Sequence, residues 1–222
     1  MFSGIDNLGL FIVAGILLNL TPGPDVLYTV THALKGGWRA GAVAALGITA
    51  GCFVHIGAAA LGVSAVLAAS STAFSVLKWL GAAYLVYVGW TMLALKEASN
   101  TPDSIASSVY ATRARGQNDH KNIFIQGFWT NALNPKVALF FLAFLPQFIA
   151  PDAEHKTLAF LVLGLVFSVN GLWVNLGYAA LGAAASSRFA TLQRGMAGLQ
   201  RVAGALFIGF GLKLALTDNP TP

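Results

Sequence analysis

Two charged residues, Asp25 and Lys136, lie within stretches of this sequence that are otherwise apolar. Charged side chains inside a membrane are costly, and those that occur face a partner, a water-filled cavity or a substrate path. Side by side, the two could hold a zwitterion, because a carboxylate attracts an ammonium group and a lysine attracts a carboxylate. His55 also lies in an apolar stretch, and histidine can exchange protons near neutral pH, here with Asp25. The alternative for His55 is a buried side chain that only packs.

Each of the two charged residues directly follows a proline that should interrupt its helix. The segments read NLTPGPD at 19–25 and NALNPK at 131–136. Proline removes an amide donor and clashes with the carbonyl four residues earlier, so Pro22, Pro24 and Pro135 are expected to break the helices. In a membrane, the freed backbone groups must face protein or a water-filled cavity. A simple proline kink with Asp25 as its cap is the alternative.

These helix breaks define a candidate binding site. The residues expected to bind substrate are Thr21, Gly23, Asp25, Asn131, Asn134 and Lys136. Asp25 and His55 are the candidates for proton coupling. We expect Lys136 to approach Asp25, either as a fixed ion pair or as a pair that a substrate separates. Cys52 is the one cysteine, so the sequence indicates no cysteine-built metal site, and no cofactor is expected.

The composition indicates what must surround this site. Charged residues make up 9% of the 222 residues and hydrophobic residues 56%, whereas about 25% of the residues in a soluble domain are charged. So few charges cannot cover a soluble protein, and we expect an all-α integral membrane protein. The net charge is +5, but the sequence has no basic stripe or RNA-binding signature, so nucleic acid is not an expected partner.

Six charge-poor stretches are long enough to cross a bilayer, for which a helix needs about 20 apolar residues. They cover residues 8–34, 40–69, 73–95, 124–149, 158–185 and 199–216. The expected proline breaks fall in the first and fourth of these spans. Most lysines and arginines lie in the loops that follow the first, third and fifth spans, which the positive-inside rule places in the cytoplasm. Both termini are therefore expected outside.

The sequence also contains a repeat. Residues 51–62 read GCFVHIGAAALG and residues 171–182 read GLWVNLGYAALG, with seven of the twelve positions identical; LTP at 20–22 likewise matches LNP at 133–135. We expect one transmembrane domain, 1–222, built from three-helix repeats at 1–95 and 124–222 and joined by a cytoplasmic linker at 96–123. Three spans per repeat give the halves opposite orientations. Such inverted repeats with matching helix breaks are typical of secondary transporters.

The residues around the first break carry a family resemblance. TPGPD at 21–25, Leu27-Tyr28 and GWRAG at 37–41 resemble the N-terminal signature of the LysE/RhtB family of amino-acid exporters, the homoserine-, threonine- and lysine-type efflux proteins. GAAYL at 81–85 and NPK at 134–136 resemble later motifs of the family. The resemblance implies a multi-pass exporter of amino acids or their derivatives in the bacterial inner membrane, driven by the proton-motive force. It leaves the substrate and any homo-oligomer open.

We therefore predict a secondary active exporter of a small amino acid or amino-acid derivative that works by proton antiport, with protons and the lipid bilayer as its other partners. The alternative is a channel or passive pore for small zwitterionic metabolites, because half-helix ends also line such pores. An enzyme is not expected, since the spans hold no second deep carboxylate beside Asp25 and no partners that would make His55 a catalytic base. Export rather than uptake rests on the resemblance.

Overall fold

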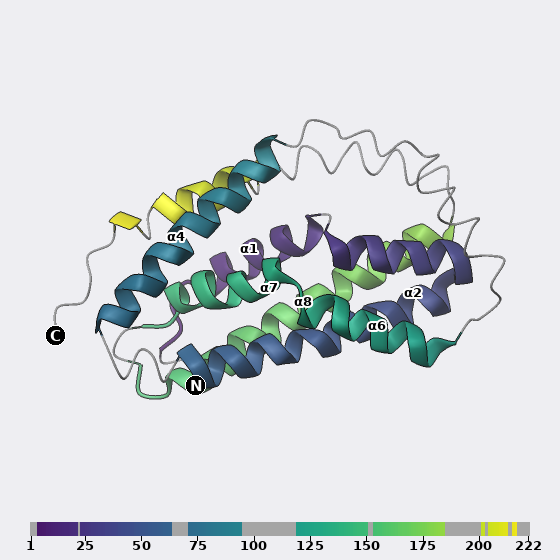
Figure 1. Ribbon diagram of the computed structural model, residues 1–222, viewed down its shortest axis with the longest axis horizontal. Helices are drawn as coiled ribbons and strands as arrows, with labels where there is room; N and C mark the ends of the chain where they lie inside the picture. Colours follow the sequence, from purple (N-terminus) through teal and green to yellow (C-terminus); the bar gives the residue numbers. More distant parts are fainter. Residues whose placement is uncertain are drawn as a thin grey trace.

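A computed structural model describes the chain at residues 4–21, 23–63, 71–94, 119–150, 153–184, 201–202, 204–212 and 215–216. These parts are almost entirely helical (Figure 1), with one isolated antiparallel bridge between Ile5 and Ile149. The prediction of an all-α protein is therefore confirmed for the described residues. Pro22 and most of the predicted 96–123 linker lie outside the described residues, as do parts of the predicted 199–216 span.

The first helix, α1 (Leu8–Leu20), is followed by a short non-helical stretch and then by α2 (Pro24–Ala58). Within α2, Gly37 has φ 71° and ψ −168°, a conformation that favours glycine, and the chain turns back on itself there (Figure 1). We call residues 24–36 the first arm of α2 and residues 38–58 its second arm. A π-helical turn, η1 (Ala59–Val63), follows the second arm. The label α2 therefore covers the second half of the predicted 8–34 span and most of the predicted 40–69 span.

The predicted 124–149 span corresponds to several short elements in series. The first, α6 (His120–Ala132), is followed by α7 (Pro135–Leu139), the π-helical turn η2 (Phe140–Phe144) and the 3₁₀ turn η3 (Leu145–Phe148). The parts before and after residues 133–134 are bent by 45° relative to each other. Asn134 caps α7 by accepting a hydrogen bond from the backbone N–H of Lys136 at 3.0 Å, and proline follows it in the first turn.

Two long helices match predicted spans: α4 (Ser71–Ala94) corresponds to 73–95, and α8 (Lys156–Ala184) corresponds to 158–185. Residues 204–212, from the last predicted span, are helical and lie along α4 (Figure 1). A side chain at Gly89 would collide with the carbonyl of Gly204, and one at Gly211 would crowd the carbonyl of Ala82. The absence of side chains at these glycines lets the two helices approach closely.

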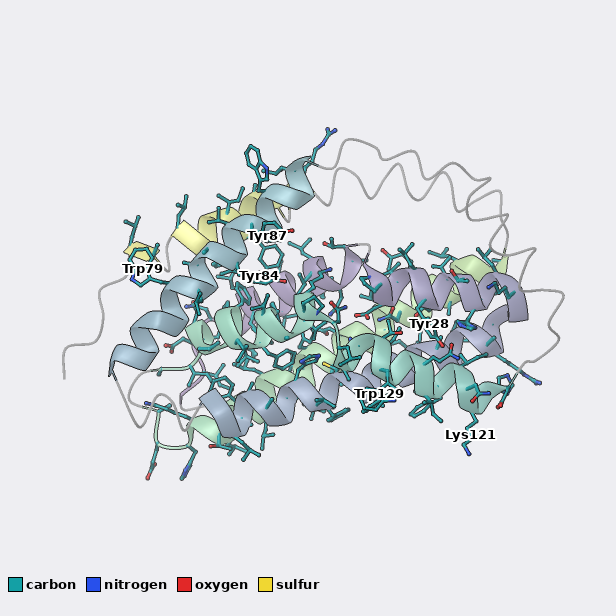
Figure 2. The ribbon with its side chains drawn as sticks, viewed as in Figure 1. Tyr28, Trp79, Tyr84, Tyr87, Lys121 and Trp129 are labelled. Atoms are coloured by element: carbon teal, nitrogen blue, oxygen red, sulfur yellow. The ribbon has the colours of Figure 1, made fainter. Side chains whose placement is uncertain are left out.

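The second arm of α2 packs closely against α6. Gly47 and Gly51 lie against the backbone carbonyls of Phe124 and Phe128, where a Cβ atom would not fit. The G-x-x-x-G pattern at 47–51 therefore serves helix packing within the chain. The first arm of α2 is joined to the same helix by the hydroxyl of Tyr28, which donates to the carbonyl of Ile123 at 2.8 Å (Figure 2).

Aromatic rings form the core where α1, the segment after α7 and α8 meet. Phe140 stacks on Phe167 with ring centroids 4.6 Å apart, and Phe144 contacts both Phe140 and Phe148. These four rings and that of Phe11 are buried. Their contacts hold the segment after Pro135 against α8, which positions the residues of the second helix interruption.

Large apolar side chains cover much of the outer surface. Leu61, Trp173 and Trp90 are 74%, 69% and 65% exposed, as expected for residues that face lipid rather than water. Within the described ranges, Pro24–Gly62 and Lys156–Ala184 are long and apolar enough to cross a membrane, and α6 with residues 135–148 passes the same test as a bent pair. These features support an integral membrane protein, whereas the six-span inverted repeat stays a prediction.

The close approach of α2 and α6 predicts a strong effect of one methyl group. Gly51→Ala places a Cβ atom against the carbonyl of Phe128, and overpacking of this kind costs about 1–3 kcal/mol of stability. We expect a lower Tm in detergent, measured by thermal unfolding. Gly57→Ala is the matched control, because nothing lies within 4 Å of a Cβ atom there. Equal Tm values for the two variants would contradict the packing described here.

Candidate functional site

Two helix interruptions lie next to each other in the interior. α1 ends at Leu20, and Thr21 and Gly23 are extended before α2 begins at Pro24. The second interruption separates α6 from α7 at residues 133–134. Hydrogen bonds cross between the two interruptions, so residues more than 100 positions apart in the sequence share one site.

Asp25, in the first turn of α2, is held by two amides. Nδ2 of Asn131 donates to Oδ2 of Asp25 at 2.9 Å, and Nδ2 of Asn134 donates to Oδ1 at 3.2 Å. Both carboxylate oxygens therefore accept a hydrogen bond, and the N-terminal end of α2 provides a dipole that favours a negative charge. This carboxylate ties α2 to the end of α6 and to the cap of α7.

Lys136 reaches across to the other interruption. Its Nζ atom donates to the backbone carbonyls of Leu18 and Thr21 at 3.0 and 3.2 Å. These carbonyls lie at the C-terminal end of α1, where the helix dipole favours a cation and the last carbonyls lack partners within the helix. Lys136 also lies in the first turn of α7, where the dipole of that helix is unfavourable for a cation. The hydrogen bonds from Nζ to the end of α1 compensate for this.

Asp25 and Lys136 do not form a direct ion pair in the described part of the structure. The two side chains line one cavity, but each binds other groups: asparagine amides in one case and backbone carbonyls in the other. The expected ion pair, whether fixed or separable by a substrate, is therefore absent from this arrangement. The C-terminal end of α1 attracts a cation, and Lys136 binds two of its carbonyls, of which that of Leu18 also accepts from the backbone N–H of Thr21.

Thr21 and Gly23 both lie in the first helix interruption. The hydroxyl of Thr21 donates to the carbonyl of Leu17 at 2.9 Å, so it closes the end of its own helix. A Cβ atom at Gly23 would lie 3.7 Å from Nζ of Lys136, so glycine keeps the space beside the ammonium group open. Both residues line the cavity that contains Asp25.

His55 lies on the second arm of α2 and is buried. Its Nε2 atom is 2.9 Å from the backbone carbonyl oxygen of Asn131. The side chain of Asn131 in turn holds Asp25. The predicted link between His55 and Asp25 is therefore indirect, since it passes through one asparagine. With Nε2 protonated, His55 gives this carbonyl a second hydrogen bond, because the carbonyl also accepts from the backbone N–H of Asn134.

The cavity between the interruptions is small. It has a volume of about 20 Å³, and its lining includes five of the six residues predicted to bind substrate: Thr21, Gly23, Asp25, Asn134 and Lys136. The sixth, Asn131, lines an adjoining cavity that also includes Asp25. A volume of this size holds about one water molecule. An amino acid would fit only after the surrounding helices move apart.

Further polar residues belong to this site and were not among the predicted binding residues. Asn19 and Asn175 line both cavities. Oδ1 of Asn175 accepts from the hydroxyl of Thr29 at 3.3 Å, and the hydroxyl of Tyr178 donates to the carbonyl of Leu20 at 2.8 Å. The repeat could have identified Asn175, because it occupies the position that corresponds to His55. No local pattern marks Tyr178.

The described residues contain no group of three or more histidine, cysteine, aspartate or glutamate side chains that could hold a metal ion. The site itself offers charges and hydrogen-bonding groups. A carboxylate, an ammonium group and several amides converge on one small polar volume inside an otherwise apolar protein. This arrangement suits a small molecule that carries both charges.

Comparison with known proteins identifies relatives along nearly the whole chain. The model of one protein family, the LysE type translocator, matches residues 16–218. A homoserine/homoserine lactone efflux protein of Salmonella typhi is 31% identical over 208 residues, which are 92% of this chain and 94% of that protein. An uncharacterized membrane protein of Pseudomonas aeruginosa is 34% identical over 215 residues, 96% of each chain. No solved structure matches the chain.

The contacts of Lys136 predict a loss of stability when its charge is removed. Lys136→Met keeps an unbranched side chain but leaves the carbonyls of Leu18 and Thr21 without this donor. We expect the free energy of unfolding to fall by about 1–3 kcal/mol, seen as a lower Tm in detergent. Lys121→Met is the control, because Lys121 is exposed and points outward from α6 (Figure 2). An unchanged Tm for Lys136→Met would argue that the ammonium group does not stabilise the end of α1.

Proposed function

Because the chain belongs to the LysE type translocator family, we propose that it is a secondary active exporter of a small amino acid or amino-acid derivative and that it works by proton antiport. The family makes it a membrane transporter rather than an enzyme. The Salmonella typhi relative is named a homoserine/homoserine lactone efflux protein, which supports an amino-acid-like substrate here. The bacterial inner membrane is the proposed location, with both termini outside.

The observation that carries the proposal is that Asp25 and Lys136 line the same cavity without binding each other. Opposite charges at one small site match the ammonium and carboxylate groups of a zwitterion. The present partners of both groups are neutral amides and carbonyls, which a charged substrate can replace. A direct ion pair would have to be broken first, at a higher cost.

The proposed architecture is a six-span bundle of two inverted three-helix repeats. In the first repeat, α1 and the first arm of α2 form one broken span. The corresponding broken span of the second repeat consists of α6 followed by α7, η2 and η3. Two observations support this arrangement: the sequence aligns residues 20–22 with 133–135, and a helix ends and another begins near each of these segments. In this arrangement the substrate site lies at the interface between repeats, as is usual in transporters of this kind. Rocking of one repeat against the other would expose the site to each side in turn.

The proposed cycle begins with the site open to the cytoplasm. Asp25 releases a proton and its carboxylate binds the substrate ammonium, while Lys136 and the first-turn amides of α2 and α7 bind the substrate carboxylate. The small volume of the cavity implies that the repeats must separate for loading. After the site turns outward and the substrate leaves, a proton binds Asp25, and the protonated carrier returns.

Transport into inverted membrane vesicles tests this function. The vesicle interior corresponds to the outside of the cell, so acidifying it should drive accumulation of a labelled amino acid against its own gradient. Across a panel of amino acids and derivatives, we expect accumulation of at least one, and we expect it to stop when the proton gradient is removed. Equilibration without accumulation would indicate a channel or passive pore instead. No movement of any amino acid would contradict the proposed substrate class.

Neutralisation of the carboxylate should stop transport. Asp25→Asn keeps the shape of the side chain but can neither attract an ammonium group by charge nor take up a proton. We therefore expect accumulation of substrate in the same vesicles to fall to background. The amount of protein inserted in the membrane should not change. Asp119→Asn is the control, because Asp119 caps the exposed start of α6. Normal accumulation by Asp25→Asn would overturn the proposed mechanism.

Exchange of the two charges should not restore function. In the double variant Asp25→Lys with Lys136→Asp, an ammonium group faces the N-terminus of α2 and the amide donors of Asn131 and Asn134, while a carboxylate faces the carbonyls of Leu18 and Thr21. Each charge then lies in a field of the wrong sign. We expect a lower Tm and no accumulation. Recovery of transport in the double variant would indicate that the pair acts only through mutual attraction.

A further inference from the structure

A second small cavity adjoins the one between the helix interruptions, and both include Asp25. The second cavity also has a volume of about 20 Å³. Its polar residues other than Asp25 are neutral: Asn19, Thr49, Cys52, Asn131, Ser168 and Asn175. Lys136 lines only the first of the two. Asp25 therefore lines both a cavity that contains Lys136 and a cavity whose other residues are uncharged.

Buried polar atoms without partners belong to residues that line this second cavity, although Asn19 lines the first cavity as well. Within the described ranges, four buried side-chain nitrogen and oxygen atoms have no hydrogen-bond partner, and three of them belong to residues that line the second cavity: Nδ2 of Asn19, Oδ1 of Asn131 and Oγ of Ser168. Asn131 and Ser168 are each only 4% exposed. Among the described residues, the one group that interacts with Oγ of Ser168 is the thiol of Cys52, and because a thiol is a weak hydrogen-bonding group, the hydroxyl can still bind a stronger partner. Leaving such groups unsatisfied is costly.

The three atoms match the bonding capacity of one water molecule. The amide nitrogen of Asn19 offers a donor, the amide oxygen of Asn131 offers an acceptor, and the hydroxyl of Ser168 offers both. A bound water usually makes about three hydrogen bonds to groups of this kind, and the cavity volume is sufficient for one. A bare cation fits less well, because the N–H group of Asn19 would point toward it. An apolar group would leave all three atoms unsatisfied.

We propose that the second cavity is a water site and that this water passes the coupling proton to and from Asp25, through a cavity that Lys136 does not line. This inference rests on the proposed proton antiport. In the uptake step, the bound water transfers a proton to a carboxylate oxygen of Asp25 and regains one from a neighbouring water molecule when the site opens. The reverse transfer occurs when Asp25 ionises to receive the substrate.

Separate approaches to one carboxylate give the coupling a structural basis. Substrate reaches Asp25 from the cavity that contains Lys136, and the proton reaches it from the neutral cavity. The proton therefore does not pass the ammonium group of Lys136, whose positive charge would repel it. Ser168 is a positioning residue in this scheme, because its hydroxyl holds the water and does not contact the substrate cavity.

The test separates proton-coupled transport from substrate exchange. Net accumulation in acidified inverted vesicles requires Asp25 to gain and lose a proton in every cycle. Exchange of labelled for unlabelled substrate, with the proton gradient collapsed, requires only the loaded carrier to change its orientation. For Ser168→Ala we expect the rate of net accumulation to fall about tenfold, which corresponds to the loss of one hydrogen bond worth about 1.4 kcal/mol. The rate of exchange should stay within about twofold of that of the original chain.

The matched control is Thr130→Ala, which also removes a hydroxyl, but one on a half-buried residue whose solvent-exposed hydrogen bond goes to the carbonyl of Gln126 in its own helix. This variant should keep both activities. An equal loss of both activities in Ser168→Ala, or no loss of either, would overturn the water site as a proton path. Failure of the proposed antiport itself is distinguishable, because the original chain would then show no dependence of accumulation on the proton gradient.

A direct measurement completes the test. An experimental structure at a resolution that shows ordered water should contain a water molecule within hydrogen-bond distance of Oδ1 of Asn131 and Oγ of Ser168, and that water should be lost or displaced in Ser168→Ala. A map that resolves other internal water molecules but shows none at this position would overturn the proposal independently of any transport assay.

Discussion

Backbone carbonyls at a helix end inside an apolar protein must find hydrogen-bond donors, and this requirement organises the centre of the molecule. The carbonyls of Leu18 and Thr21 bind the ammonium group of Lys136, and the carbonyl of Leu20 binds the hydroxyl of Tyr178. At the other interruption, His55 lies within hydrogen-bond distance of the carbonyl at the end of α6. The donors come from other helices, so satisfying the interruptions also joins the helices together.

The same requirement explains why the two half-buried charges remain apart. An ammonium group bound to helix-end carbonyls and a carboxylate bound to amide donors are both stabilised without neutralising each other. Each keeps its charge available for a third group that enters the cavity between them. A direct pair would hold the helices more rigidly and would oppose the entry of a substrate. The arrangement is therefore better suited to reversible binding than to a purely structural link.

Packing around the site restricts where movement can occur. The glycines at 47 and 51 hold the second arm of α2 against α6 at backbone distance, and the phenylalanine rings hold the segment after Pro135 against α8. Side chains that interlock in this way resist small continuous shifts. The cavities adjoin these packed units: Phe167, which stacks on Phe140, lines both of them together with the polar residues of the site.

The sequence by itself determined the class of protein and the chemistry of its centre. Its scarcity of charge indicated a membrane protein, the prolines at 24 and 135 coincide with new helix starts, and the rarity of deep charges selected Asp25 and Lys136. Only the tertiary structure decided which groups these residues bind. Local sequence records which donors and acceptors are present, but not which helix end lies within reach of a long side chain. That depends on how helices more than 100 residues apart pack, and this packing placed Lys136 on the carbonyls of α1 and brought Ser168 beside Asp25 in the second cavity.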